Sequence, residues 1–383
     1  MDNLTHTLCG AALAKTRLGR LSPLAPLSLL LGANLPDADA VVMLFGADEM
    51  ARRAAYLVHH RGITHAMLGL AVQALLLAAA IRWCERGGRG ATNGALHGAP
   101  LPWSAHLLPA AVGLLTHPLL DFLNNYGVRP WLPFSTLRHF GDLVFIVDPW
   151  LWLLLGATAA LAGPRWRAGH VVWGLLGAAA LAVLLLHDRS PGFVKLAFPP
   201  LLLLLAVLRA GRFGVERPGR VVAVGAAGVA GYLALLLACG ARAEAQVRAD
   251  PVRAATLRMR SPAVADPTRW SFAFDDGTRV RWRTFDLVGR EVVRGAVDAS
   301  GAHAADGLAT GADDPLVRLA WQQPAAVAMR SFARLPWGWS ERRNDGGATV
   351  HLGDARYATR RDPDSWCVVR VELSAEQVAV ASR

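Results

Sequence analysis

The chain has 383 residues, of which 53% are hydrophobic and 18% are charged, and its mean hydropathy is +0.30. This composition is too apolar for an ordinary soluble enzyme of this length and predicts a mainly α polytopic membrane protein. The formal net charge of +11 is spread over short loops and the C-terminal third, without basic tracts that alternate with stacking aromatic residues. We therefore expect contact with a lipid bilayer and no nucleic-acid partner.

The cysteines and the N-terminus exclude two further classes. Cys9, Cys84, Cys239 and Cys367 are far apart and form no CxxC pair, so we expect neither a disulfide framework nor a thiolate zinc site. The stretch "MDNLTHTLCGAALAKTRLGR" has its basic residues after its short apolar run, so we do not expect a cleaved signal peptide.

Several apolar segments approach the roughly 20 residues that a helix needs to cross a bilayer core. We expect membrane helices at residues 67–83, 106–123, 143–163, 169–186, 192–208 and 221–240. Segment 4–14 is too short to span alone, and segment 24–45 is interrupted by "ANLPDADA". Because non-helical backbone at membrane depth needs protein or water around it, this interruption predicts a cavity.

Basic residues in the short loops predict the orientation. Twelve fall on one side and seven on the other, so the positive-inside rule makes the first side cytoplasmic. The candidate site and everything after residue 240 are then periplasmic, in a bacterial inner membrane. The first set is Lys15, Arg17, Arg20, Arg82, Arg86, Arg89, Arg165, Arg167, Arg209, Arg212, Arg217 and Arg220, and the second is Arg52, Arg53, Arg61, Arg129, Arg138, Arg189 and Lys195.

The pattern changes after residue 240. In "RWSFAFDDGTRVRWRTFDL", apolar and polar residues alternate on both sides of an Asp-Asp-Gly turn, which predicts a β-hairpin. "ATVHLGDARYATR" and "SWCVVRVELS" alternate in the same way. We expect a helical membrane domain at residues 1–240 and a smaller β-rich extramembrane domain at 241–383, whose His303 and His351 lack acidic neighbours at ligand spacing.

Ionisable residues gather in four motifs of the first 150 residues, where they are costly in a membrane and therefore indicate function. His117 and Asp121 in "THPLLDFLNNYG" are four apart, so they project from one helical face as two ligands of one metal would. A hydrogen bond that joins helices is the alternative for this pair. Nitrogen and carboxylate ligands without thiolate favour zinc, with manganese or iron as alternatives.

The other motifs supply further candidate ligands. His60 and His65 in "HHRGITHAML" are five apart, but a tight turn at Gly62 would fold the first over the second. Asp37 and Asp39 straddle one residue after a proline and offer two oxygens to a common centre or, alternatively, lie in a solvated loop. His6 is a ligand or the end of a helix near the interface. A mixed His/Asp set of this kind suits a hydrolytic site with one to three ions.

Other polar residues are assigned to supporting roles. Arg61, between two candidate ligands, either clamps an anionic substrate or extends to the membrane interface. His59 is more consistent with a neighbour than a ligand. Asp148 is an additional ligand, a ligand-orienting group or the N-cap of a helix. The residues expected to orient ligands are Asn34, Thr64, Asn124, Asn125, Asp142 and Asp148.

Five ordered motifs, "DNLTHTLCGAALA", "GANLPDAD", "HHRGITHA", "THPLLDFLNNYG" and "PFS…GDLVFIVDP", resemble the YdjM-like family of bacterial inner-membrane proteins over roughly residues 1–165. The family is associated with metal-dependent hydrolysis and is distantly similar to zinc-dependent phospholipase C and P1 nuclease. The resemblance implies a His-x-x-x-Asp metal pair, matched by His117 and Asp121. Where members of the family commonly carry serine, this chain has Ala66, which argues against a serine nucleophile there.

The resemblance implies a membrane-bound hydrolase of a phosphoester or lipid-linked substrate. Arg61 or Arg138 would bind the phosphate, and Asp37 or Asp39 would act as base if not a ligand. Two alternatives remain: a metal-ion or proton-coupled transporter, and a non-catalytic regulatory membrane protein. A transporter would need ionisable groups at several depths, whereas those named above gather at one end.

Overall fold

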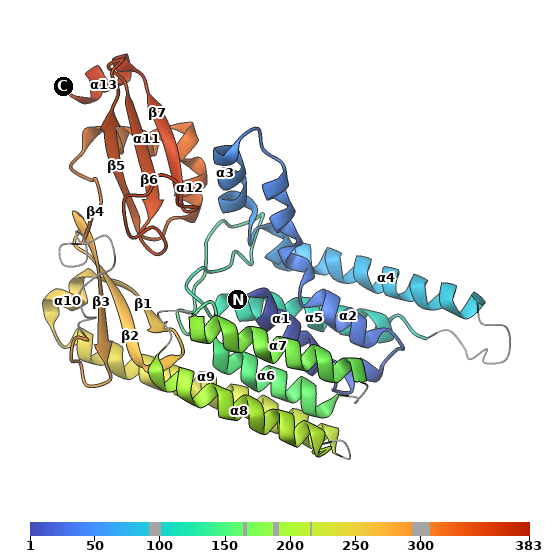
Figure 1. The fold of residues 1–383 in the computed structure, drawn as a ribbon. Helices are drawn as coiled ribbons and strands as arrows, with labels where there is room; N and C mark the ends of the chain where they lie inside the picture. The colour runs from blue at the N-terminus through green and yellow to red at the C-terminus, as the bar shows by residue number, and fades with distance from the viewer. Residues whose placement is uncertain (92–100, 164–166, 187–190, 215–216, 293–306) are drawn as a thin grey trace. The chain divides into compact units, whose positions relative to one another are not determined.

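A computed structural model describes residues 1–91, 101–163, 167–186, 191–214, 217–292 and 307–383. The chain divides into two compact units (Figure 1). Unit 1 comprises Met1–Ala38, Ile63–Gly240 and Ser261–Thr268, and unit 2 comprises Asp39–Gly62, Ala241–Arg260 and Arg269–Arg383. Most of the expected membrane domain is therefore in unit 1, but the segment Asp39–Gly62 belongs to unit 2.

Helices make up most of unit 1. The first part of the chain forms α1 (Asn3–Leu13), η1 (Leu18–Arg20), α2 (Ala25–Gly32), η2 (Leu35–Leu44), η3 (Ile63–His65), α4 (Met67–Ala91) and α5 (Ser104–Phe122). Four more helices follow: α6 (Pro149–Ala162), α7 (Arg167–Leu186), α8 (Gly192–Ala210) and α9 (Pro218–Arg248). The 3-10 segment η2 contains the interrupting "PDAD" motif and continues into unit 2 at Asp39.

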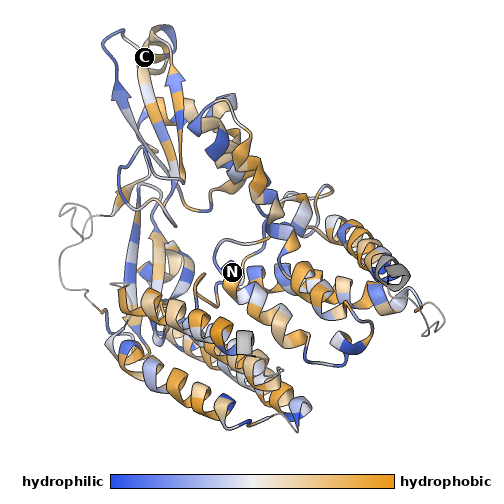
Figure 2. Cartoon of the chain, turned by 45° about the vertical axis from the view of Figure 1, so that its right-hand side comes forward, coloured by the Kyte–Doolittle hydropathy of each residue, from blue (hydrophilic) through white to orange (hydrophobic). Residues whose placement is uncertain are grey.

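Helices α4, α7, α8 and α9 are long and apolar enough to cross a membrane. Helix α2 and η2, bent by 49°, form a further candidate if they count as one span. At most 28% of the residues in the four apolar windows are buried, so most of their residues have exposed surface. Figure 2 colours these helices largely as hydrophobic. Such surfaces suit lipid better than water, which supports a membrane protein.

Two expected spans differ from the prediction. Helix α6 has 14 residues and begins at Pro149, because the Asp148 side chain accepts hydrogen bonds from the Trp150 and Leu151 amides and thereby caps it. Helix α5 has nearly the expected bounds but is not among the candidate spans in the described part of the chain. Two histidines, an aspartate and two internal prolines lower the hydropathy of α5, and one of its faces is buried.

Some expectations cannot be traced in the structure. Arg165, Arg189 and His303 lie outside the described residues, as do the side chains of Arg89 and Arg167. The membrane orientation therefore stays a prediction, and so does the extramembrane position of residues 241–383.

Most of the antiparallel β-structure that the alternating patterns predict is in unit 2, while the end of β1 and the start of β2 fall in the unit 1 segment Ser261–Thr268. One sheet has the order β1-β2-β3-β4, formed by Leu257–Ala263, Asp266–Asp275, Arg279–Asp286 and Leu308–Ala309. A second sheet has the order β5-β6-β7, formed by Pro336–Arg342, Ala348–Asp354 and Val368–Leu373. The helices are α10 (Pro251–Thr256), α11 (Pro315–Gln322), η4 (Pro324–Ala326), α12 (Val327–Phe332) and α13 (Ala375–Ala381). The predicted hairpin is β2–β3, where Asp275 pairs with Val280.

Helix α3 (Glu49–His59) comes from the N-terminal part of the chain but packs within unit 2, against α12 and β7. The Asp48 side chain caps its N-terminus by accepting a hydrogen bond from Ala51 N. The Arg53 guanidinium donates to the carbonyl oxygens of Pro363 and Ser365 at 3.1 and 3.2 Å. Tyr56 contacts Trp366 edge to face. These contacts place the segment before "HHRG" in unit 2.

Candidate metal centre

The candidate centre is built on close packing between α2 and α5. A Cβ atom on Gly113 would lie 2.9 Å from the Leu29 carbonyl oxygen, and one on Gly32 would lie 3.0 Å from the Leu114 nitrogen. Small residues of this kind let helix backbones approach closely. As a result, the Ala33 carbonyl oxygen at the end of α2 reaches His117 Nδ1 on α5 at 2.7 Å.

Asp37 of η2, His65 of η3, and His117 and Asp121 of α5 form what we call the four-ligand cluster. One ligand atom from each lies within 4.8 Å of the others. His65 Nε2 is 3.1 Å from His117 Nε2 and 3.4 Å from both Asp37 Oδ1 and Asp121 Oδ2. His117 Nε2 is 3.3 Å from Asp37 Oδ1 and 3.4 Å from Asp121 Oδ2.

Hydrogen bonds to the imidazole rings direct their lone pairs into this cluster. The Ala33 carbonyl can only accept, so His117 Nδ1 carries the proton and the neutral ring has its lone pair on Nε2. His65 Nδ1 lies 3.0 Å from Thr64 Oγ1, which can accept a hydrogen bond from Nδ1 and so leave the Nε2 lone pair of His65 for the cluster. Two imidazole nitrogens and two carboxylate oxygens, all electron-pair donors, then converge on one point.

These separations agree with tetrahedral coordination. With metal–ligand bonds of about 2.0 Å, neighbouring ligand atoms of a tetrahedron lie about 3.3 Å apart. Five of the six separations in the four-ligand cluster are 3.1–3.4 Å. The donor set, two histidines and two aspartates, is one that zinc accepts.

His6 of α1 lies against the four-ligand cluster. Its ring stacks on His117 with a centroid separation of 3.7 Å, and its Nε2 is 3.4 Å from Asp121 Oδ1. Neither ring nitrogen has a hydrogen-bond partner among the described residues. Burial lowers the pKa of His6 to about 4, so the ring is neutral at physiological pH and can offer a lone pair. The Met1 amino group contacts Asp121 Oδ1 from the same side.

The four ligands differ in their access to solvent. The side chains of His65, His117 and Asp121 have no exposed surface, whereas 12% of the Asp37 side chain is exposed. A substrate would therefore reach the cluster at Asp37.

Asp39, His60 and Arg61 lie together in unit 2, and we call them the Asp39 group. His60 Nδ1 is 2.9 Å from Asp39 Oδ1, and the Arg61 backbone amide donates to Asp39 Oδ2 at 3.1 Å. The His60 ring stacks on Tyr56 at 4.5 Å. Arg61 is buried and adopts a φ of 54°, which is unusual for a residue with a side chain. Whether Asp39 and His60 contribute to a metal centre, and whether Arg61 binds an anion, stays a prediction.

The residues expected to orient ligands have several roles. Thr64 contacts His65, and its role in orienting a metal ligand stays a prediction. Asn34 joins α1 to α2, since its Oδ1 accepts from Thr7 Oγ1 and its Nδ2 donates to the Leu30 carbonyl. Asn124 Oδ1 accepts from Tyr126 N in the turn after α5, a turn that also contains Asn125. Asp142 lies in the segment whose amides bond to the Phe122 and Leu123 carbonyls.

The structure favours structural roles for Asp148 and Arg138. Besides capping α6, Asp148 accepts a hydrogen bond from Tyr232 Oη at 2.7 Å, so the N-cap alternative describes it. Arg138 Nη1 lies 3.4 and 3.3 Å from the Tyr126 and Gly127 carbonyl oxygens, and its guanidinium lies over the Tyr126 ring. These contacts order the loop after α5.

Sequence reasoning assigned no role to three polar groups of unit 1. The Ala33 carbonyl could not be found because any residue type supplies one. Asp2 caps α1 and accepts from Trp152 Nε1 at 3.0 Å, and its place before "NLT" was an available N-cap signal. Glu85 of α4 pairs with His106 of α5 at 3.0 Å and also accepts from Leu24 N. This buried pair joins α2, α4 and α5.

A model of a known protein family matches the N-terminal part of the chain. The family described as "YdjM inner membrane protein" matches residues 1–190, which include every residue of the four-ligand cluster. No curated protein and no solved structure matches the chain, so the expected similarity to phospholipase C and P1 nuclease has no support from these comparisons. Residues 1–190 therefore belong to the YdjM inner membrane protein family.

Proposed function

We propose that the four-ligand cluster binds a divalent metal, zinc by ligand preference, and that the protein is a membrane-bound metal-dependent hydrolase. The observation that carries the metal proposal is the convergence of four electron-pair donors at five separations of 3.1–3.4 Å. A metal cation at their centre would offset the repulsion among the four facing lone pairs of this buried site, in addition to the Met1 amino group at Asp121 Oδ1. One ion fits this cluster, and the expectation of up to three ions stays a prediction.

The same geometry supports hydrolysis. A zinc ion held there would supply Lewis acidity and activate water at neutral pH. Asp37, the exposed member, lies where a substrate would approach, while Asp121 and the two histidines hold their positions from the protein interior. We propose a phosphoester, carried by a lipid or a small molecule, as the substrate class. Arg61 and Asp39 belong to unit 2, and their expected roles as anion clamp and base stay predictions.

A non-catalytic role is the second candidate, and burial favours it. Three of the four side chains have no exposed surface, and structural zinc sites usually have four protein ligands and no open position. A metal in this cluster would tie η2, η3 and α5 together. The protein would then be a regulatory or structural membrane protein with a metal-stabilised bundle.

Metal analysis of the purified full chain in detergent tests the site. We expect about one zinc per chain in the wild type and none in His117→Ala or Asp121→Ala. His106→Ala is the matched control, because His106 lies on the same helix, is 2% exposed and also pairs with a carboxylate. Unchanged zinc in His117→Ala and Asp121→Ala would refute the proposed ligands, and loss in His106→Ala as well would point to general misfolding.

Hydrolysis of bis(p-nitrophenyl) phosphate and of phospholipid in detergent tests the activity. We expect hydrolysis that a chelator abolishes, that added zinc restores, and that His117→Ala lacks. A zinc-loaded wild type that hydrolyses neither substrate would refute phosphoester hydrolysis and favour the structural role. Asp39→Asn that keeps zinc but loses activity would support Asp39 as the base.

A further inference from the structure

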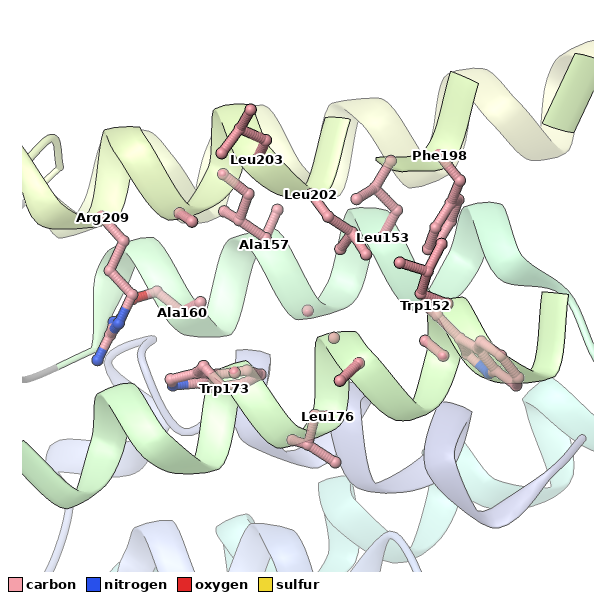
Figure 3. Close-up of a pocket in the computed structure, with 18 of the residues that line it drawn as sticks. Trp152, Leu153, Ala157, Ala160, Trp173, Leu176, Phe198, Leu202, Leu203 and Arg209 are labelled. Atoms are coloured by element: carbon pink, nitrogen blue, oxygen red, sulfur yellow. The ribbon is translucent and has the colours of Figure 1, made fainter. Parts of the chain in front are cut away.

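A cavity of about 340 Å³ lies in unit 1 between α1, α6, α7 and α8. Its walls are almost wholly apolar, and this volume falls in the range of small-molecule sites. Figure 3 shows Arg209, Ala160 and Trp173 at one end and Trp152 and Phe198 at the other. The cavity is separate from the four-ligand cluster, although α1 contributes Leu4 and Leu8 to the cavity and His6 to the cluster's surroundings.

The length of the cavity matches one leaflet of a bilayer. Phe198 and Arg209 are eleven residues apart on α8, which corresponds to about 16 Å of helix. The hydrocarbon core of a bilayer is about 30 Å thick, so the cavity has the depth of a single acyl chain.

Glycines on α6 and α7 keep the cavity open. A Cβ atom on Gly174 would meet nothing within 4 Å, and one on Gly177 would meet only the Leu202 methyl groups, at 3.8 and 4.0 Å. On Gly156, it would meet only the Leu8 methyl groups, at 3.8 Å. Protein interiors are close-packed, so space of this size beside apolar side chains favours an apolar occupant.

One end of the cavity is cationic. Arg209 lines it, is 4% exposed and donates from Nη1 to the Ala160 carbonyl at the end of α6. Lys15 is nearby: its Nζ would lie 3.7 Å from a Cβ atom on Gly163. Burial, together with the Arg209 charge, lowers the pKa of Lys15, as expected for neighbouring cations. None of the described residues that line the cavity is acidic.

We propose that the cavity binds one acyl chain of an anionic phospholipid, whose phosphate lies at Arg209 and Lys15. Charge complementarity selects the head group, and the apolar walls hold the chain. The predicted orientation places both basic residues on the cytoplasmic side, where anionic lipid head groups attract Lys and Arg. This site uses none of the proposed metal ligands, so it does not depend on the proposed hydrolase activity.

Native mass spectrometry of the full chain in detergent, with added phosphatidylglycerol or phosphatidylcholine of identical acyl chains, tests the head-group contact. We expect the wild type to retain one phosphatidylglycerol about tenfold more than phosphatidylcholine, and Arg209→Gln to lose that preference. Arg209→Lys should keep it, and so should Arg220→Gln, which removes an exposed arginine from the same predicted side. Equal retention of the two lipids by the wild type, or an unchanged preference in Arg209→Gln, would overturn the proposal.

Filling the cavity tests the position of the acyl chain. Gly177→Leu should reduce retention of phosphatidylglycerol several-fold, because its side chain would occupy the cavity. Gly231→Leu is the control on α9, where a Cβ atom meets nothing within 4 Å and the residue does not line the cavity. Full retention in Gly177→Leu, with a monodisperse protein, would place the lipid elsewhere and overturn the proposal.

Discussion

The two buried His/Asp groups of this chain differ in how their polar atoms are matched. In the Asp39 group, the Asp39 carboxylate meets donors at both oxygens, His60 Nδ1 and the Arg61 amide. In the four-ligand cluster, four acceptor atoms face one another, and the Ala33 carbonyl orients His117 so that its Nε2 lone pair points inward. The Asp39 oxygens are met by donors of the protein, whereas the four facing acceptors can be held together by a metal cation.

This difference shows that nearby histidines and carboxylates in a sequence do not define a metal site by themselves. His60 and His65 belong to the same motif, yet Nδ1 of the first bonds to an aspartate and Nδ1 of the second lies beside the Thr64 hydroxyl. The group on the far side of each ring decides which nitrogen is left for a metal. The predictions below test that distinction.

Removing the metal should have the largest effect on stability, and it should affect the four-ligand cluster but not the Asp39 group. At free zinc about 1,000-fold above the dissociation constant, binding stabilises the folded state by about 4 kcal/mol, which a chelator would remove. Hydrogen exchange followed by mass spectrometry should then show lost protection in peptides of α5 and unchanged protection in α3. His117→Ala, which lacks the metal, should not respond to the chelator, and equal loss of protection in α3 would abolish the distinction.

Replacing Asp37 or Asp39 by the isosteric asparagine should give the next largest effect, a difference in zinc affinity between the two variants. Asp37→Asn should weaken zinc binding more than about 100-fold, since it removes a charged ligand. Asp39→Asn should leave zinc binding unchanged and lower the free energy of unfolding by about 1–3 kcal/mol, through its bonds to His60 and Arg61. Zinc titration against a chromophoric chelator measures both affinities. Equal losses in the two variants would mean that Asp39 also belongs to the metal centre.

Removing the Thr64 hydroxyl, which lies beside His65 Nδ1, should have a smaller effect on zinc affinity. Thr64→Val removes the hydroxyl next to His65 Nδ1 and should weaken zinc binding about tenfold, the range for groups that orient metal ligands. Thr64→Ser should restore the affinity because it keeps the hydroxyl. If Thr64→Val binds zinc as tightly as the wild type, the Thr64 hydroxyl does not set the tautomer of His65.

The parts of the centre that follow from local sequence geometry could be predicted. His117 and Asp121 are one helical turn apart, and the structure brings their ligand atoms to 3.4 Å. The hairpin around Asp275-Asp276-Gly277 follows from strand alternation and forms β2–β3. In both cases, the residues that matter are close together in the chain.

The parts that depend on contacts between distant helices could not be predicted. The stacking of His6 on His117 requires α1, α2 and α5 to pack closely at Gly10, Gly32 and Gly113, and a glycine in a sequence does not reveal its partner. The placement of His60 in unit 2 depends on α3 packing against α12 and β7, elements about 270 or more residues further along the chain. Sequence spacing therefore identified candidate ligands without determining how they are grouped.

Replacing His60 should have the smallest effect on stability and none on zinc binding. The same substitution at His65 should have the opposite result for zinc binding. His60→Phe keeps an aromatic ring against Tyr56 but removes the donor to Asp39 Oδ1, which should lower the free energy of unfolding by about 1 kcal/mol. Zinc content should not change, because the Asp39 carboxylate would still accept from the Arg61 amide and the four-ligand cluster would keep all its ligands. His65→Phe, the same substitution five residues later, should abolish zinc binding. Zinc loss in a folded His60→Phe variant would make His60 a ligand after all, and the Asp39 group would then have to be described as part of the metal centre.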